Sequence, residues 1–182
     1  MQTDLFGHTR KPRKSRLRSV TERYDRDTLE ARVARLVWLN KVFPTGYGFG
    51  MPFESFFVFD EAKMTFLNGQ FIATSLLATA FIEHRFASVL AARGFVRESR
   101  AGFKRIVATL RAKGWVNSLL LDKVDLIRQR RNPFVHLKEF NHAHNLARRS
   151  VDSRTDPYEL IESDAKEALT VMYTVAIGKG AI

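Results

Sequence analysis

The chain has no cysteine among its 182 residues, which excludes disulfides and thiolate metal sites and fits a reducing compartment. It also lacks a long hydrophobic run: the longest, Phe71 to Ile82, ends at Glu83 and is too short to span a bilayer. The N-terminus is polar and basic, without the apolar core of a secretory signal. We therefore expect a soluble, cytoplasmic protein with no membrane partner.

The chain contains fewer acidic than basic residues. There are 19 Asp and Glu against 30 Lys and Arg, which gives a formal charge of +11. This excess is typical of proteins that bind polyanions and favours a nucleic-acid partner. Hydrophobic residues make up 45% of the chain and include 15 Phe, which is enough for one core in a domain of this size.

Alternation of apolar and polar residues over strand lengths is missing, and no internal repeat is evident. Apolar residues recur instead at helical spacing, which predicts an all-α, up-down bundle of about five to six helices joined by short loops. The helices are expected over about 28–41, 54–67, 70–93, 103–113, 119–130 and 164–176.

The first 20 residues are basic and carry almost nothing apolar. They cannot offset the entropy of ordering, so we expect a mobile arm followed by one helical domain at 21–182. The sequence Asp27-Thr28-Leu29-Glu30 has the form of a capping box, which predicts that the first helix begins near residue 28. Its apolar face consists of Leu29, Val33, Leu36 and Val37.

The segment 43–52 is rich in glycine and aromatic residues and looks like a phosphate-binding loop. Such a loop leaves a strand and opens a helix, whereas this one follows a helix. We therefore favour an aromatic loop, with Phe43, Tyr47 and Phe49 packed on the bundle, over a nucleotide site.

Other boundaries follow from local signals. Gly94 and Gly114 are expected to end two helices. The polar, basic stretch 138–157 is interpreted as a loop, and Ser163 or Asp164 as the cap of the last helix. The helical stripe of the second helix is predicted to be Phe56, Phe59, Lys63, Met64 and Leu67. That of the last helix is predicted to be Ala165, Ala168, Leu169, Met172, Val175 and Ala176.

The residues with the clearest chemical potential are Arg131-Asn132-Pro133-Phe134-Val135-His136, at the end of an amphipathic run. They place a guanidinium, an amide and an imidazole close together. Residues five apart on an unbroken helix point about 140° away from each other. Pro133 is unfavourable inside a helix, so we expect it to break the helix and re-aim these side chains, with Asn132 as the cap of a new helix.

With this motif in an all-helical chain, residues 55–178 resemble the HEPN superfamily, which comprises helical-bundle ribonuclease and nucleotide-binding domains of prokaryotic defence and toxin systems. The hallmark of the family is Arg-polar-x3-His on a core helix, matched here by Arg131, Asn132 and His136. The resemblance implies a metal-independent endoribonuclease without a cofactor, acting as a homodimer with a composite site. It also implies an orienting role for Glu83 and an antitoxin or inhibitor protein as a possible partner.

The chemistry of these residues agrees with that implication. RNA supplies its own nucleophile, the 2′-hydroxyl, so cleavage needs a base, a cation for the pentacoordinate phosphorane and an acid for the leaving oxygen. The His136 imidazole suits proton transfer, the planar Arg131 guanidinium binds two phosphate oxygens at once, and Asn132 can position either group. A zinc site at His136, His142 and His144 is disfavoured, because i, i+2 residues face apart on a helix and no further ligand stands nearby.

Purely structural roles are the alternative: Asn132 as a helix cap, Arg131 paired with Glu83, and His136 as a hydrogen-bonded residue inside the bundle. Three functions therefore compete. We favour the endoribonuclease over a noncatalytic RNA- or nucleotide-binding bundle and over a helical interaction module. RNA is expected to be bound by Arg13, Arg16, Arg128, Arg130, Lys138, Arg148 and Arg149.

Overall fold

The computed structural model describes residues 13–43 and 52–178. Within these ranges the chain forms eight α-helices, one 3₁₀ turn and no β-strand, so the predicted all-α class is confirmed. None of these helices is both long and apolar enough to cross a membrane. The elements are α1 (Arg13–Val42), α2 (Phe53–Leu67), α3 (Phe71–Ala92), α4 (Val96–Ser99), α5 (Phe103–Lys113), α6 (Ser118–Arg131), η1 (Asn132–Phe134), α7 (Leu146–Ser153) and α8 (Pro157–Ala176).

The contacts divide the chain into two units, residues 1–38 and 39–182. The division therefore falls within α1 rather than near residue 20, where the sequence placed the domain boundary. In the first unit the structure describes a single helical segment, and the rest of the predicted arm, residues 1–12, lies outside the described residues.

The start of α1 differs from the prediction. The helix begins at Arg13, inside the segment predicted to be an arm. The capping box is wrong, because the Thr28 hydroxyl donates to the Tyr24 carbonyl at 2.8 Å, a bond made in a helix interior. Strong helix formers, together with an i,i+4 ion pair at 2.8 Å between Arg18 and Glu22, favour helix in this basic segment.

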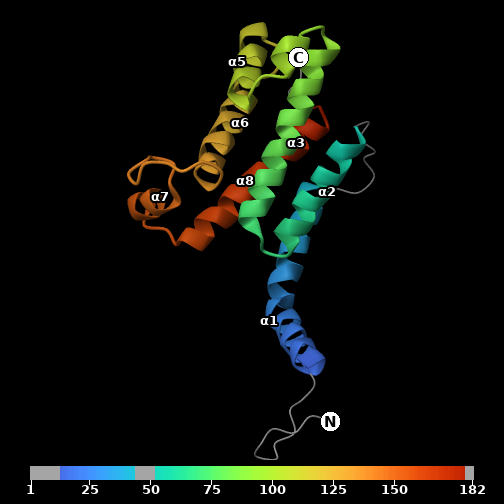
Figure 1. Cartoon of the computed structure of the whole chain (residues 1–182), viewed down its shortest axis with the longest axis vertical. Coiled ribbons are helices and arrows are strands. Elements are labelled where there is room, and N and C mark those ends of the chain that lie inside the picture. Colours follow the sequence, from blue (N-terminus) through green and yellow to red (C-terminus); the bar gives the residue numbers. More distant parts are fainter. Residues whose placement is uncertain (1–12, 44–51, 179–182) are drawn as a thin grey trace, which may run out of the picture. The chain divides into compact units, whose positions relative to one another are not determined.

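The core of the second unit is organised around α3. This helix packs most extensively on α2 and α8 and also contacts α5 and α6 (Figure 1). Burial of each large side chain between these helices contributes about 2 kcal/mol. The predicted buried face of the last helix is confirmed, since all six of its residues are buried. The largest fully buried apolar side chains are Phe66, Phe81, Ile82, Leu90, Ile106, Leu110, Leu121, Leu169, Met172 and Val124.

Two glycine stop signals are confirmed. Gly94 and Gly114 follow α3 and α5 with φ of 85° and 66°, the left-handed conformation that glycine adopts without strain. The prediction missed two helices, α4 with 4 residues and α7 with 8. Such short segments carry too few apolar repeats to be recognised. Because α7 lies within 138–157, that stretch is not only a loop.

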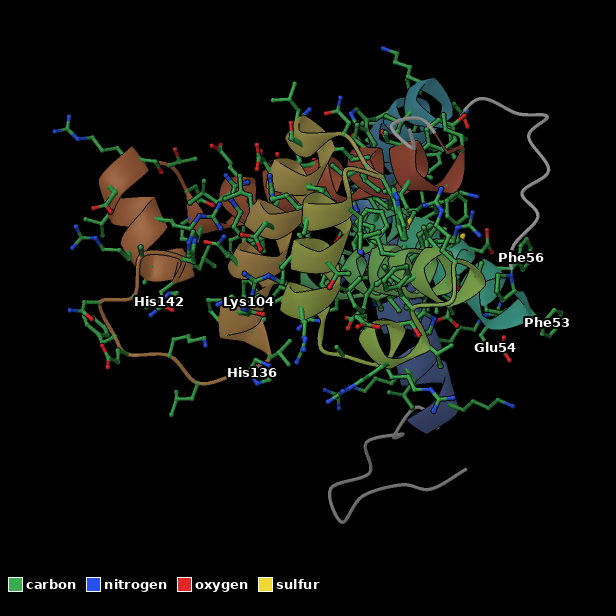
Figure 2. All side chains as sticks on the ribbon, turned by 90° about the horizontal axis from the view of Figure 1, so that it is seen from above. Phe53, Glu54, Phe56, Lys104, His136 and His142 are labelled. Atoms are coloured by element: carbon green, nitrogen blue, oxygen red, sulfur yellow. The ribbon has the colours of Figure 1, made fainter. Side chains whose placement is uncertain are left out.

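The stripe predicted for α2 is wrong at two positions. Phe56 and Met64 are 53% and 49% exposed, whereas the buried side of the helix is formed by Ser55, Phe59, Ala62 and Phe66. At the start of α2, Phe57 makes edge-to-face contacts with both Phe53 and Phe56, and Figure 2 shows the last two projecting outward.

The structure also bears on the predictions for the aromatic loop and for the cap of the last helix. Phe43 packs on Phe59 and Tyr173, with ring centroids 5.6 and 4.9 Å apart, whereas Tyr47 and Phe49 lie outside the described residues. The predicted cap of the last helix at residue 163 or 164 is wrong. The carboxylate of Asp156 accepts from the Tyr158 N–H at 2.7 Å, and α8 begins with Pro157 at its first position.

Candidate functional site

A cavity of about 560 Å³ is formed by residues of α3, α5 and the end of α6. This volume lies in the range of small-ligand sites. The cavity brings together five residues that the sequence singled out, namely Glu83, Arg128, Arg131, Asn132 and His136. The rest of its lining comes from the start of α5, namely Gly102, Phe103, Lys104, Arg105 and Ala108.

The turn after α6 explains how Arg131 and His136 reach the same cavity. Pro133 has no N–H, so the α-helical hydrogen bond cannot form there. The N–H groups of Val135 and His136 instead both donate to the Asn132 carbonyl, at 3.0 and 2.8 Å. The chain thus tightens into a 3₁₀ turn, as expected for a helix broken at Pro133, and residues on both sides of the turn line the cavity. The predicted new helix does not form, because Asn132 keeps helical angles (φ −56°, ψ −40°) and the turn ends at residue 134.

Asn132 is not the N-cap of a new helix but occupies the C-cap position of α6. In the amide orientation that satisfies both groups, its NH₂ donates to the Arg128 carbonyl at 3.1 Å, and its oxygen accepts from the Arg128 guanidinium at 3.2 Å. The same guanidinium donates to Asp125 at 2.8 Å. Asn132 and Asp125 therefore hold the Arg128 side chain in a fixed orientation at the cavity wall.

Arg131 has a donor that nothing in the described ranges satisfies. Its Nε is buried without a hydrogen-bond partner, at a cost of about 1–3 kcal/mol for such a group. The alternative in which Arg131 pairs with Glu83 is not observed, and Glu83 forms no ion pair with any other described residue. Arg131 also lines the cavity, and a guanidinium there is the kind of group that binds an anion.

His136 is not the buried histidine of the structural alternative. Its side chain is exposed. Figure 2 shows His136 beyond the end of α6 and Lys104 on α5, and both residues line the cavity. An exposed imidazole at a cavity is accessible both to a substrate and to solvent protons, as a proton-transfer group must be.

The electrostatic character of the cavity is positive. Its lining contains one carboxylate, that of Glu83. The first turn of α5 adds to the positive potential, because the N-cap Gly102 has no side chain to accept from the free N–H groups. The cationic side chains of the lining are Lys104, Arg105, Arg128 and Arg131.

Lys104 and Arg105 were missed by sequence reasoning. They stand far from the Arg131 motif in the chain, and only the packing of α5 on α6 brings them to the cavity. Of the other predicted RNA-binding residues, Lys138 lies outside the cavity lining and is partly buried, while Arg13 and Arg16 belong to α1.

Besides Arg128, which pairs with Asp125, three predicted RNA-binding arginines are engaged in ion pairs. The Asp164 carboxylate accepts from Arg149 at 2.6 and 2.8 Å and from Arg130 at 3.1 Å. Arg130 also pairs with Glu167 at 2.6 Å, and Arg148 with an aspartate within α7 at 2.8 Å. The pairs of Arg130 and Arg149 connect α6 and α7 to α8. The charges of all three arginines are compensated by carboxylates, and none of the three lines the candidate site.

His142 and His144 form a separate pair. The Nδ1 of His142 accepts from the His144 backbone N–H at 3.2 Å, and the ring centroids are 5.7 Å apart. Burial, and next the charges of His142, Arg149, Arg130 and Arg128, lower the pKa of His144 below its ordinary value. Among the described residues, no group of three or more His, Asp or Glu side chains is placed to hold a metal ion.

No protein-family model, curated protein or solved structure matches this chain. The resemblance to the HEPN superfamily therefore rests on the Arg131–His136 motif and on the helical class of the fold.

Proposed function

We propose that this protein is a metal-independent endoribonuclease that binds the scissile phosphate in the cavity of Arg131 and His136. One observation carries the proposal. A single cavity is lined by the Arg131 guanidinium, which forms no ion pair with a described residue, by the exposed His136 imidazole and by three further cations. The net charge of +11 favours association with a polyanion such as RNA.

In the proposed reaction the 2′-hydroxyl oxygen attacks the adjacent phosphorus. A new O–P bond forms and the P–O5′ bond breaks, which gives a 2′,3′-cyclic phosphate and a 5′-hydroxyl. His136 accepts the proton of the 2′-hydroxyl, and the leaving 5′-oxygen is protonated by water or by the imidazolium of a second copy. Arg131 donates to the nonbridging oxygens, whose negative charge grows in the phosphorane. Glu83 lines the same cavity as His136, and the proposal gives it the orienting role that the HEPN resemblance implies.

The proposal includes a homodimer formed beside the motif. Leu137 and Phe140, which follow His136, are 101% and 93% exposed. The loop that presents them is held by Asn145, whose side-chain NH₂ donates to the carbonyls of Glu139 and Phe140 at 2.7 and 3.1 Å. Burying each apolar side chain would contribute about 2 kcal/mol. A two-fold contact at this loop would bring two cavities together, as a composite site requires.

Light scattering tests the dimer. We expect wild type to be dimeric at tens of micromolar and Leu137→Glu to be monomeric, because a charge would be buried at the contact. Leu119→Glu, on the 70% exposed Leu119 of α6, is the matched control and should remain dimeric. A monomeric wild-type protein at this concentration would remove the dimer from the proposal.

The catalytic roles are tested by cleavage of generic RNA in EDTA. His136→Gln and Arg131→Ala should each reduce the rate by about 10²-fold or more, the scale of acid-base and electrostatic contributions. His84→Gln is the matched control, since His84 is exposed on α3 and does not line the cavity. Circular dichroism establishes that the variants fold. Wild-type activity in the His136→Gln protein would refute the assignment.

Noncatalytic binding of RNA or a nucleotide is the second candidate, because the same cations bind phosphate without any chemistry. It predicts that RNA is retained but not cut. Affinity should then fall in Arg131→Ala and remain unchanged in His136→Gln. The HEPN resemblance also implies a toxin or phage-defence role. We include this role in the ribonuclease proposal, and it requires that the protein cleave RNA.

A further inference from the structure

The part of the cavity formed by α5 contributes two cations that the proposed reaction does not use. Lys104 and Arg105 are exposed at the start of the helix, and neither makes a side-chain hydrogen bond or ion pair with any described residue. Arg111, near the other end of α5, pairs with Asp122 at 2.8 Å. The positive charge at the far end of α5 is therefore paired with a carboxylate, whereas the charges of Lys104 and Arg105 at the cavity end are not.

The charge of the lining exceeds what one phosphodiester can neutralise. Four cationic side chains face one carboxylate, Glu83. A second carboxylate, Asp125, compensates Arg128 from outside the lining. Two positive charges remain, whereas a phosphodiester carries a single negative charge. Binding the scissile phosphate thus leaves one cation without a partner, and a second phosphodiester would balance it.

The cations come from two separate elements. Arg131 lies at the end of α6, next to the turn that carries His136, whereas Lys104 and Arg105 lie in the first turn of α5. The cavity volume of about 560 Å³ is sufficient for more than a single phosphate group. The two clusters can therefore hold two phosphates of one strand.

We propose that Lys104 and Arg105 bind the phosphate next to the scissile one. This inference rests on the proposed function and names its substrate class: an RNA strand with at least two consecutive phosphodiesters, hence a trinucleotide or longer. Lys104 and Arg105 are binding residues, whose contribution appears in KM rather than in the chemical step.

Kinetics on two short substrates test the proposal. A ribodinucleoside monophosphate has one phosphodiester, and a ribotrinucleotide with the same cleavable step has two. Wild type should show a kcat/KM at least about 10-fold higher for the trinucleotide, as one charge-assisted hydrogen bond implies. Lys104→Ala and Arg105→Ala should raise KM for the trinucleotide, with kcat preserved and the dinucleotide unaffected. Lys123→Ala, which removes an exposed α6 lysine outside this cavity, should behave as wild type.

Salt dependence gives a second readout. Removing one cation that binds a phosphate should reduce the slope of log affinity against log salt by about 0.7 for a single strand. The affinity is measured with an all-2′-deoxy trinucleotide, which binds without being cleaved. A wild-type slope and preference in both Lys104→Ala and Arg105→Ala would overturn the inference, as would equal reductions of kcat/KM on the two cleavable substrates.

The two proposals fail differently. If no RNA is cleaved but the deoxytrinucleotide still binds more tightly than the deoxydinucleotide, and Lys104→Ala abolishes that difference, then the ribonuclease is wrong and the two-phosphate site stands. If RNA is cleaved through His136 with no dependence on Lys104 or Arg105, then only the two-phosphate site is wrong.

Discussion

Asp164 is expected to be the most sensitive polar position in the second unit. It is 8% exposed and accepts two hydrogen bonds from Arg149 and one from Arg130. Asp164→Asn leaves Arg149, whose side chain is 15% exposed, without a carboxylate, while Arg130 keeps Glu167. Removing one partner of a buried pair costs about 3–5 kcal/mol. Because Arg130 remains paired, we expect about 3 kcal/mol.

The measurement is the free energy of unfolding from urea denaturation followed by circular dichroism. The control is Asp122→Asn, which breaks the pair with Arg111, where the side chains are 61% and 43% exposed. This pair lies in water, so breaking it should cost less than about 1 kcal/mol. Equal, small decreases for both variants would show that the Asp164 network does not stabilise the packing of α6 and α7 on α8.

Two further predictions concern stability. The folded pKa of His144 is lowered below the ordinary value of 6.5, so the unfolded chain binds this proton first. Stability should therefore decrease as pH falls below about 6.5, and His144→Gln should flatten the dependence of Tm on pH between 5 and 8. Leu121→Ala removes a fully buried side chain and should cost about 3 kcal/mol, whereas Leu119→Ala, at a 70% exposed position, should cost less than about 0.5 kcal/mol in the same urea titration.

The longer helices of the second unit could be predicted because their apolar residues repeat over several turns and because Gly94 and Gly114 mark two ends. The start of α1 could not, since its basic residues look disordered by composition although they are good helix formers. The start of α8 was also placed wrongly, but here the sequence does contain a local signal. The pair Asp156-Pro157 is a cap followed by a first-position proline, and this signal could have placed the helix correctly.

The candidate site was predictable only where it is local in sequence. Arg131 and His136 were found from their chemistry and from the proline between them, and the 3₁₀ turn brings both to one cavity. Lys104 and Arg105 reach that cavity through tertiary packing, which no spacing in the sequence reveals. The role of Asp164 is equally hidden, because an acid before an apolar run looks the same whether it caps a helix or pairs with an arginine.

The most direct test of the proposed ribonuclease is cleavage, in EDTA, of a 2′-deoxy strand that contains one ribonucleotide. The proposal predicts a single cut after that ribonucleotide, a 2′,3′-cyclic phosphate end, no cleavage of the all-deoxy strand, and no cut by His136→Gln. A 3′-hydroxyl product, cleavage of the all-deoxy strand or a requirement for added metal would contradict it.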